Sequence, residues 1–202
     1  MDQKYQDYKV AFLGKSSSGK SSLINALFGF CGLENRKESS YINMAAAWFR
    51  NEKNRFGDFY DSIMAIDTPG FASSLENDET YIPFYCHALK LADCVVWVVQ
   101  GNTRSDRVDQ EMLLRLKPFF RKGAKIVVCI NMVDKIGGEC DKNWNSEINE
   151  PNDEMGRFIQ QRCDNLQQKF LEIDFQVDTI IACSAVKGYG IEPLMKAIVK
   201  ME

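Results

Sequence analysis

Histidine is nearly absent from this chain of 202 residues, with His87 as its single occurrence. Metal sites built from imidazole ligands and Ser-His-Asp catalytic triads therefore have almost no basis here. The seven cysteines are odd in number and show no CxxC spacing, and several lie in apolar runs, where a reduced thiol behaves as a small hydrophobic group. We therefore expect a reducing, cytoplasmic setting rather than a disulfide framework.

Long apolar runs are also missing, since VVWVVQ and IVVCI are far shorter than a bilayer span. The opening residues, MDQKYQDYKV, lack the apolar core of a secretory signal, so we expect none. The formal net charge of -3 argues against a mainly electrostatic hold on nucleic acid or an anionic membrane. This length suits one substantial core better than two, so we expect a single domain over residues 1–202.

Short apolar runs alternate with longer segments of helical period, which predicts strands alternating with helices. The expected strands cover residues 8–13, 62–67, 94–99, 126–130 and 179–183. The expected helices cover residues 19–28, 75–91, 106–122, 155–170 and 191–199. Asp106 is the expected N-cap of the third helix, and Pro83 should begin, kink or interrupt the second. Residues 135–151 are expected to form a loop, and residues 41–50 either an edge strand or a contact surface.

This alternation predicts an α/β fold with a mostly parallel, six-stranded sheet and helices on both of its faces. In such sheets, ligands bind beyond the carboxyl ends of the strands. The informative polar residues of this chain directly follow its predicted strands. We therefore expect one binding site at that edge of the sheet.

The segment after the first expected strand, GKSSSGKS, matches the pattern G-x-x-x-x-G-K-[ST]. Its glycines let backbone N–H groups turn toward phosphate oxygens, and the following helix adds its N-terminal dipole. Lys20 would reach the β- and γ-phosphates, and the Ser21 hydroxyl would bind Mg²⁺. The expected phosphate-binding set is Gly14, Lys15, Ser16, Ser17, Ser18, Gly19, Lys20, Ser21 and Ser22.

The second motif, DTPG, ends the expected strand at residues 62–67. The carboxylate of Asp67 can hold Mg²⁺ through a water molecule, and the N–H of Gly70 can approach a γ-phosphate closely because no side chain intervenes. Taken alone, this tetrapeptide would be a plain turn. Its place after the phosphate loop favours the functional interpretation, with Lys20, Ser21, Asp67 and Gly70 as catalytic residues and Ser21 and Asp67 as metal ligands.

Two further segments are expected to contact the base. Asp134, in NMVD, can accept from both the ring N–H and the exocyclic amine of guanine, a pair of donors that adenine lacks. In IACSAVKGYG, the N–H of Ala185 can donate to the guanine carbonyl, while Gly188 and Gly190 allow a tight turn. Each segment alone also fits an ordinary turn after a strand. The expected base-contacting set is Asn131, Met132, Asp134, Ser184, Ala185 and Val186.

These four motifs, in this order and spacing, resemble those of the Era-like branch of the TRAFAC GTPases, and most closely the prophage- and island-encoded YfjP/YeeP group. KVAFLGKSSSGKSSLINALFG, ADCVVWVVQ and SAVKGYGIEPLMKAI carry the resemblance, which covers essentially the whole chain. It implies a three-layer P-loop NTPase G domain that binds GTP or GDP with Mg²⁺ and hydrolyses GTP. A link to ribosomes or RNA follows from the family alone.

The chain departs from the family pattern at three places. Met132 stands where the family's N-K-x-D motif has a lysine over the purine, although methionine can also cover the ring as an apolar group. No threonine precedes Thr68 to close on Mg²⁺, and Ser39 or Ser40 are the available substitutes. Phe71 follows Gly70 where Ras-type enzymes have a glutamine that orients water, which predicts a slow intrinsic rate.

Other groups could supply the missing catalysis. K⁺ or Na⁺ is one candidate. Era-like relatives that use K⁺ often have asparagine at the place of Ser17, whereas dynamin-like GTPases have serine there, so Ser17 leaves this candidate open without supporting it. A second copy of the chain is another, with Arg104 or Arg107 acting in trans. Solvated surface charge is the simpler interpretation of both arginines.

Three functional hypotheses follow. In the first, an enzyme switch, GTP orders residues 31–58 and 71–80, which then contact an effector or a second copy, and hydrolysis releases them. In the second, the chain is a GTP-binding interaction or dimerisation module with little or no hydrolysis. In the third, NMVD matches by chance and the chain is an ATPase.

Overall fold

The computed structural model describes residues 7–29, 45–50, 62–72, 75–103, 105–136, 144–145 and 147–199. A six-stranded sheet in the order β2-β3-β1-β4-β5-β8 forms its centre. The parallel strands are β1 (Asp7–Gly14), β3 (Ser62–Asp67), β4 (Cys94–Gln100), β5 (Lys125–Asn131) and β8 (Thr179–Ala182). The edge strand β2 (Ala45–Arg50) pairs antiparallel with β3. The predicted sheet is confirmed, and residues 45–50 form the edge strand rather than an unpaired contact surface.

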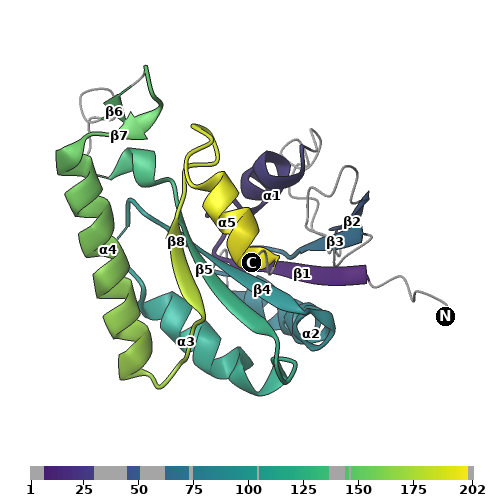
Figure 1. The fold of residues 1–202 in the computed structure, drawn as a ribbon. Helices are drawn as coiled ribbons and strands as arrows, with labels where there is room; N and C mark the ends of the chain where they lie inside the picture. Colours follow the sequence, from purple (N-terminus) through teal and green to yellow (C-terminus); the bar gives the residue numbers. More distant parts are fainter. Residues whose placement is uncertain are drawn as a thin grey trace.

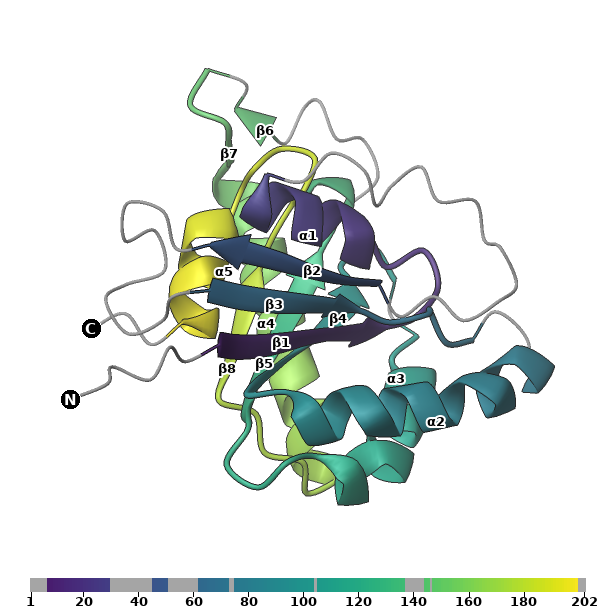
Figure 2. The same ribbon diagram turned by 90° about the vertical axis from the view of Figure 1, so that its right-hand side faces the viewer.

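Helices cover both faces of the sheet (Figures 1 and 2). On one face lie α1 (Lys20–Phe28) and α5 (Ile191–Ile198), and on the other lie α2 (Leu75–Leu91), α3 (Arg107–Leu116) and α4 (Asp153–Glu172). Successive side chains of a strand point to opposite faces. In β4, Trp97 and Val99 therefore pack with α2, α3 and α4, while Val96 and Val98 pack with α1 and α5. This explains why β4 is apolar at nearly every position.

One helix has its predicted bounds and another is shorter than predicted. α2 spans Leu75–Leu91 as predicted, and Pro83 lies inside it without interrupting it. α3 ends at Leu116 and is followed by a 3-10 helix, η2 (Lys117–Phe119), so the predicted helix over 106–122 was too long. Pro118 explains the early end of α3, because a proline has no N–H to continue the helical hydrogen-bond ladder. In the described part of the chain, no helix combines the length and the apolar character that a bilayer crossing requires.

A small hairpin occupies part of the segment that was predicted to be a loop. It consists of β6 (Trp144–Asn145) and β7 (Glu150–Pro151), which pair antiparallel. The Trp144 ring packs edge-on against Tyr189, with ring centroids 5.4 Å apart, and its Nε1 donates to Asn149 Oδ1 at 3.2 Å. Asn149 Nδ2 in turn donates to Lys187 O. The hairpin therefore packs on the loop between β8 and α5, and its strands are too short to show a sequence period.

A buried ion cluster joins α3 to α4. Asp106 is the N-cap residue of α3, as predicted, but its side chain makes no capping hydrogen bond. It accepts instead from both terminal nitrogens of Arg162, at 2.7 and 2.5 Å, and from Lys169 Nζ at 2.7 Å. Burial alone would raise the pKa of Asp106, but the hydrogen bonds from Arg162 and Lys169 outweigh it and hold the pKa below its usual value. Arg162 thus takes a buried place on the face of α4 that the sequence predicted to be apolar.

We predict that Arg162→Ala lowers the free energy of unfolding by about 3–5 kcal/mol, because it leaves the Asp106 carboxylate buried with half of its partners. The control is Arg107→Ala, since Arg107 has a side chain 86% exposed and pairs with Glu111 one turn along the helix. That pair should contribute less than about 0.5 kcal/mol. Urea denaturation of both variants measures the difference, and equal losses would show that the buried cluster does not stabilise the fold.

Candidate functional site

All four motifs meet at one edge of the sheet. Gly14, Asp67 and Asn131 are the last residues of β1, β3 and β5, and Ala182 is the last residue of β8. These strands run parallel, so their carboxyl ends lie side by side. The structure therefore brings together the segments that the sequence singled out one by one.

Glycine is required at both ends of the phosphate loop. A Cβ on Gly14 would lie 2.3 Å from Val98 O, so the loop can leave β1 beside β4 only without a side chain. Gly19 has a φ of +84° and leads into α1, and a Cβ there would lie 2.4 Å from Asn131 Nδ2. The loop thus depends on close backbone approach at both positions. Its N–H groups and the start of α1 lie where the sequence predicts an anion site.

Lys20 is buried against this loop, with 7% of its surface exposed. Its Nζ donates to Gly14 O and to Lys15 O, both at 3.0 Å. Burial lowers the pKa of Lys20 to about 8, and the charges of Asp67 and Asp109 act in the opposite direction. An anion that arrived beside this ammonium would favour its charged form.

Ser21 and Asp67 lie in direct contact, with Ser21 Oγ donating to Asp67 Oδ2 at 2.7 Å. They come from α1 and from the end of β3, so the fold, not the local sequence, pairs them. A hydroxyl and a carboxylate oxygen are hard ligands of the kind that Mg²⁺ prefers. Among the described residues no group of three or more His, Cys, Asp or Glu side chains forms a metal site. The pair therefore fits a Mg²⁺ ion whose other ligands are phosphate oxygens and water.

The DTPG segment docks against the phosphate loop. A Cβ on Gly70 would lie 2.5 Å from Ser16 Cα, and Ser16 N donates to Phe71 O at 2.8 Å. The Phe71 ring is completely buried and packs on Trp97, with ring centroids 5.3 Å apart. Its side chain therefore points into the core. No side chain at this position can orient a water molecule, as the sequence predicted.

Asn131 joins the phosphate loop to the loop after β8. Its Nδ2 donates to Ser18 O at 3.1 Å, and its Oδ1 accepts from Ala185 N at 3.2 Å. The N–H that was predicted to meet a guanine carbonyl is therefore directed, in this structure, at Asn131. Met132 has a φ of +62°, and its Cε lies 3.2 Å from where a Cβ on Gly19 would be. Asp134 is 5% exposed and lies in the short 3-10 helix η3 (Val133–Lys135) beside these groups.

The other predicted site residues lie either near this edge of the sheet or outside the residues that the structure describes. Ser184 is completely buried, whereas Val186 is 82% exposed. Ser22 lies in the first turn of α1, and Gly188 and Gly190 both have positive φ, as predicted. Arg107 is exposed and paired with Glu111. Ser39, Ser40, Arg104 and most of residues 31–58 lie outside the described residues.

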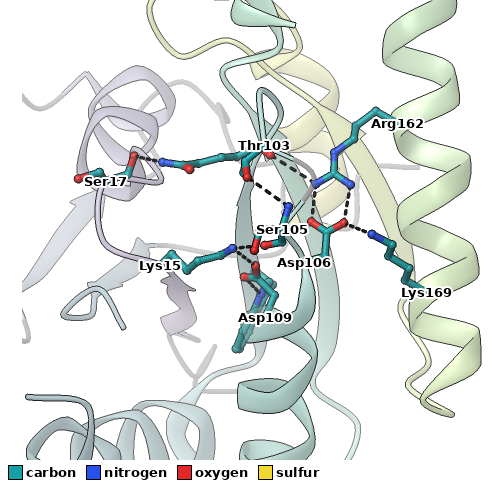
Figure 3. Close-up of polar contacts among 10 residues, drawn as sticks. Lys15, Ser17, Thr103, Ser105, Asp106, Asp109, Arg162 and Lys169 are labelled. Atoms are coloured by element: carbon teal, nitrogen blue, oxygen red, sulfur yellow. Dashed lines mark hydrogen bonds and ion pairs between the residues drawn. The ribbon is translucent and has the colours of Figure 1, made fainter. Parts of the chain in front are cut away.

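The sequence did not predict several side-chain contacts beside the phosphate loop. The main chain of Lys15 lies in the predicted phosphate loop, and its ammonium contacts Asp109 of α3 (Figure 3). Gln100 Nε2 donates to Ser17 O at 2.8 Å and so holds the tip of the loop. The motif leaves positions 15 and 17 unspecified, and no local signal connects them to residues 83 or more positions away. Only the fold could show these contacts.

The fold and the site together define a P-loop nucleotide-binding domain. The model of one family, described as "50S ribosome-binding GTPase", matches residues 9–132, and the chain belongs to this family. The predicted resemblance to Era-like P-loop GTPases is thereby confirmed. The family's description does not say which partner this chain itself binds.

Curated relatives agree with this assignment. A probable GTP-binding protein EngB from Rickettsia akari is 28% identical over 141 residues, which cover 63% of this chain and 63% of EngB. The uncharacterized protein YfjP of Escherichia coli K12 is 29% identical over 104 residues, which cover 50% of this chain and 33% of YfjP. The matches span less than two thirds of either relative.

Among solved structures, a variant of Era from Aquifex aeolicus bound to GDP·AlF4⁻ superposes with a TM-score of 0.65. The match covers 96% of this chain and 56% of the Era chain, at 23% identity. At this identity the likeness establishes the fold alone.

We predict that Gly19→Ala destabilises the nucleotide-free chain more than Gly123→Ala does. Both glycines have a positive φ near +80°, where a side chain costs about 1–2 kcal/mol, but a Cβ on Gly123 would have nothing within 4 Å. At Gly19 the clash with Asn131 adds about 1–3 kcal/mol of overpacking. Thermal unfolding of the two variants isolates the clash. Equal shifts would mean that Asn131 does not lie tightly against the loop.

Proposed function

We propose that this chain binds GTP and GDP with Mg²⁺ and hydrolyses GTP slowly on its own, acting as a nucleotide-dependent switch. Membership of a GTPase family supports the reaction class. The slow hydrolysis rate, the use of Mg²⁺ and the nucleotide-dependent switching are proposed from the residues of the site.

One observation carries the proposal: the Asn131 side chain bonds to both Ser18 O in the phosphate loop and Ala185 N in the loop after β8. It ties the expected phosphate end of the site to the expected base end. Asp134 is buried in the same turn, where its carboxylate would accept from the two donors of a guanine. Adenine lacks this pair of donors, and the difference would give base selectivity.

The residues divide the work as follows. Backbone N–H groups of residues 15–22 hold the phosphates, and Lys20 places its ammonium against them. Ser21 and Asp67 hold Mg²⁺, which supplies positive charge to the phosphate oxygens and the leaving group. Gly70 lets the chain approach the γ-phosphate without a side chain in between.

Phe71 accounts for the slow intrinsic rate that we propose. Its ring belongs to the core against Trp97, so the chain has no group there to orient the attacking water. A monovalent cation such as K⁺ or Na⁺, or a second copy of the chain, is the expected source of additional catalysis. Residues 31–58 and 71–80 are the expected contact segments for that copy or for an effector.

Three further points belong to the proposal. We propose that residues 1–202 form one GTPase domain, since the described elements build one six-stranded sheet with its two helix layers and a small hairpin, β6-β7, beside it. Cys86, Cys94, Cys129, Cys163 and Cys183 are free thiols, which supports a reducing, cytoplasmic location. The family's description makes the ribosome the first partner to test.

Phosphate release from GTP and from ATP, in Mg²⁺ with either K⁺ or Na⁺, tests the function. We expect slow release from GTP alone, abolished in Lys20→Ala. Guanine-selective binding without any release would instead support the second candidate, a GTP-binding dimerisation or interaction module, which the buried Phe71 favours. Equal release from ATP would contradict guanine selectivity.

We predict that Asp134→Asn weakens GDP binding by at least about 100-fold and shifts preference toward xanthosine diphosphate. An asparagine amide can donate to the extra carbonyl of xanthine but cannot accept both guanine donors. Asp153→Asn, at the exposed start of α4, is the matched control and should leave both affinities unchanged. Competition against a labelled GDP measures the two variants. Unchanged GDP affinity in Asp134→Asn would mean that this carboxylate does not read the base.

We also predict that Mg-GDP binding takes up protons near pH 8. The pKa of Lys20 lies at about 8 in the free chain, so at that pH about half of the molecules carry a neutral amine. The phosphates raise the pKa again, so binding should take up about half a proton at pH 8 and very little near pH 6.8. GDP itself is almost fully ionised at pH 8 because its second phosphate pKa lies near 6.

Calorimetric titrations in buffers of different ionisation enthalpy measure this uptake as a slope. By the same linkage, affinity should fall as the pH rises through 8, because the free chain then loses the proton that the complex keeps. A slope of zero at pH 8 would show that Lys20 is fully charged before nucleotide binds.

A further inference from the structure

The first turn of α3 places two buried carboxylates on opposite sides (Figure 3). Asp109 and Asp106 are 0% and 1% exposed. Asp109 faces the phosphate loop, where its Oδ2 lies 2.8 Å from Lys15 Nζ. Asp106 faces α4, where it binds Arg162 and Lys169. The two aspartates thus share one helix turn but serve different neighbours.

The Lys15 side chain is held at several points. Its Nζ also donates to Ser105 O at 2.5 Å, and the side chain is 14% exposed. Trp97 Nε1 donates to the other Asp109 oxygen at 3.1 Å, which fixes the carboxylate from the sheet side. The ammonium is therefore directed at α3, while the main chain of Lys15 stays in the phosphate loop.

That main chain supports the catalytic lysine. Lys15 O accepts from Lys20 Nζ at 3.0 Å and from Ser18 N at 3.2 Å. The position of this carbonyl therefore determines where the turn from Lys15 to Ser18 begins. It also determines where one of the two acceptors of the Lys20 ammonium lies. A continuous set of contacts leads from Asp109 through the Lys15 side chain and its carbonyl to Lys20.

We propose that Asp109 is a positioning residue for the phosphate loop, acting through the Lys15 ammonium to hold the carbonyl against which Lys20 is placed. This inference rests on the proposed function for its nucleotide consequence, but its structural part stands on the contacts alone. A loop held in its binding shape loses less conformational freedom when a nucleotide arrives, so affinity is higher.

A buried ion pair can also stabilise a fold without positioning anything, and Asp106 provides the comparison. It is as buried as Asp109, lies in the same turn and is also paired with cations, but its side chain makes no direct contact with a phosphate-loop residue and reaches Ser17 only through Arg162 and Gln100. Asp106→Asn and Asp109→Asn are therefore matched substitutions. Both keep the shape of the side chain and remove its charge.

The test measures two quantities for each variant: the dissociation rate of a fluorescent GDP analogue in Mg²⁺, and amide hydrogen exchange in the nucleotide-free chain. Asp109→Asn should raise the dissociation rate by about 10-fold, at the low end of losses seen when a supporting contact is removed. It should also speed exchange at residues 14–19. Asp106→Asn should lower the melting temperature, leave dissociation within about twofold and leave exchange at residues 14–19 unchanged.

Unchanged exchange at residues 14–19 in Asp109→Asn would overturn the proposal, and so would equal effects of the two substitutions. If Asp109→Asn does not fold, the double variant Lys15→Met with Asp109→Asn removes both charges together, and the same faster exchange is expected. A wild-type chain that fails to bind the GDP analogue would refute the proposed function. The exchange comparison would still decide the role of Asp109, since it needs no nucleotide.

Discussion

The parallel pairing of the sheet is the constraint on which the rest of the structure depends. Because β1, β3, β5 and β8 run in one direction, their last residues gather at one edge, and four short segments become one site. Asn131 shows how tightly they gather, since a single side chain reaches both Ser18 and Ala185. A Cβ on Gly19 would collide with that side chain. The glycine is thus needed both for the turn and for this approach.

Around that edge, buried charges are satisfied by partners from distant elements. Lys20 meets carbonyls of its own loop, and Lys15 and Arg162 meet aspartates of α3. A buried charge without a partner would destabilise the fold by roughly several kcal/mol. The need for these pairs therefore restricts where the helices can lie. Phe71 differs from these charged groups. Its side chain points away from the site and packs in the core against Trp97.

The strands and most helices could be predicted because their apolar periods are local. The four motifs could be predicted because each follows a strand, and the sheet then brings them together. Contacts between distant side chains leave no such period, so Lys15 with Asp109 and Arg162 with Asp106 were invisible in the sequence. The hairpin of β6 and β7 was too short to show a pattern. Pro83 lies inside α2, whose bounds the sequence predicted although a proline there removes one helical hydrogen bond.

Selective binding of guanine nucleotide is the central claim of this account, and calorimetric titration of the nucleotide-free chain with GDP and with ADP in Mg²⁺ tests it most directly. The account predicts saturable binding of GDP at one site and binding of ADP weaker by at least about 100-fold, since adenine lacks the two donors that Asp134 would bind in guanine. Equal affinities for the two nucleotides, or no binding of GDP, would contradict it.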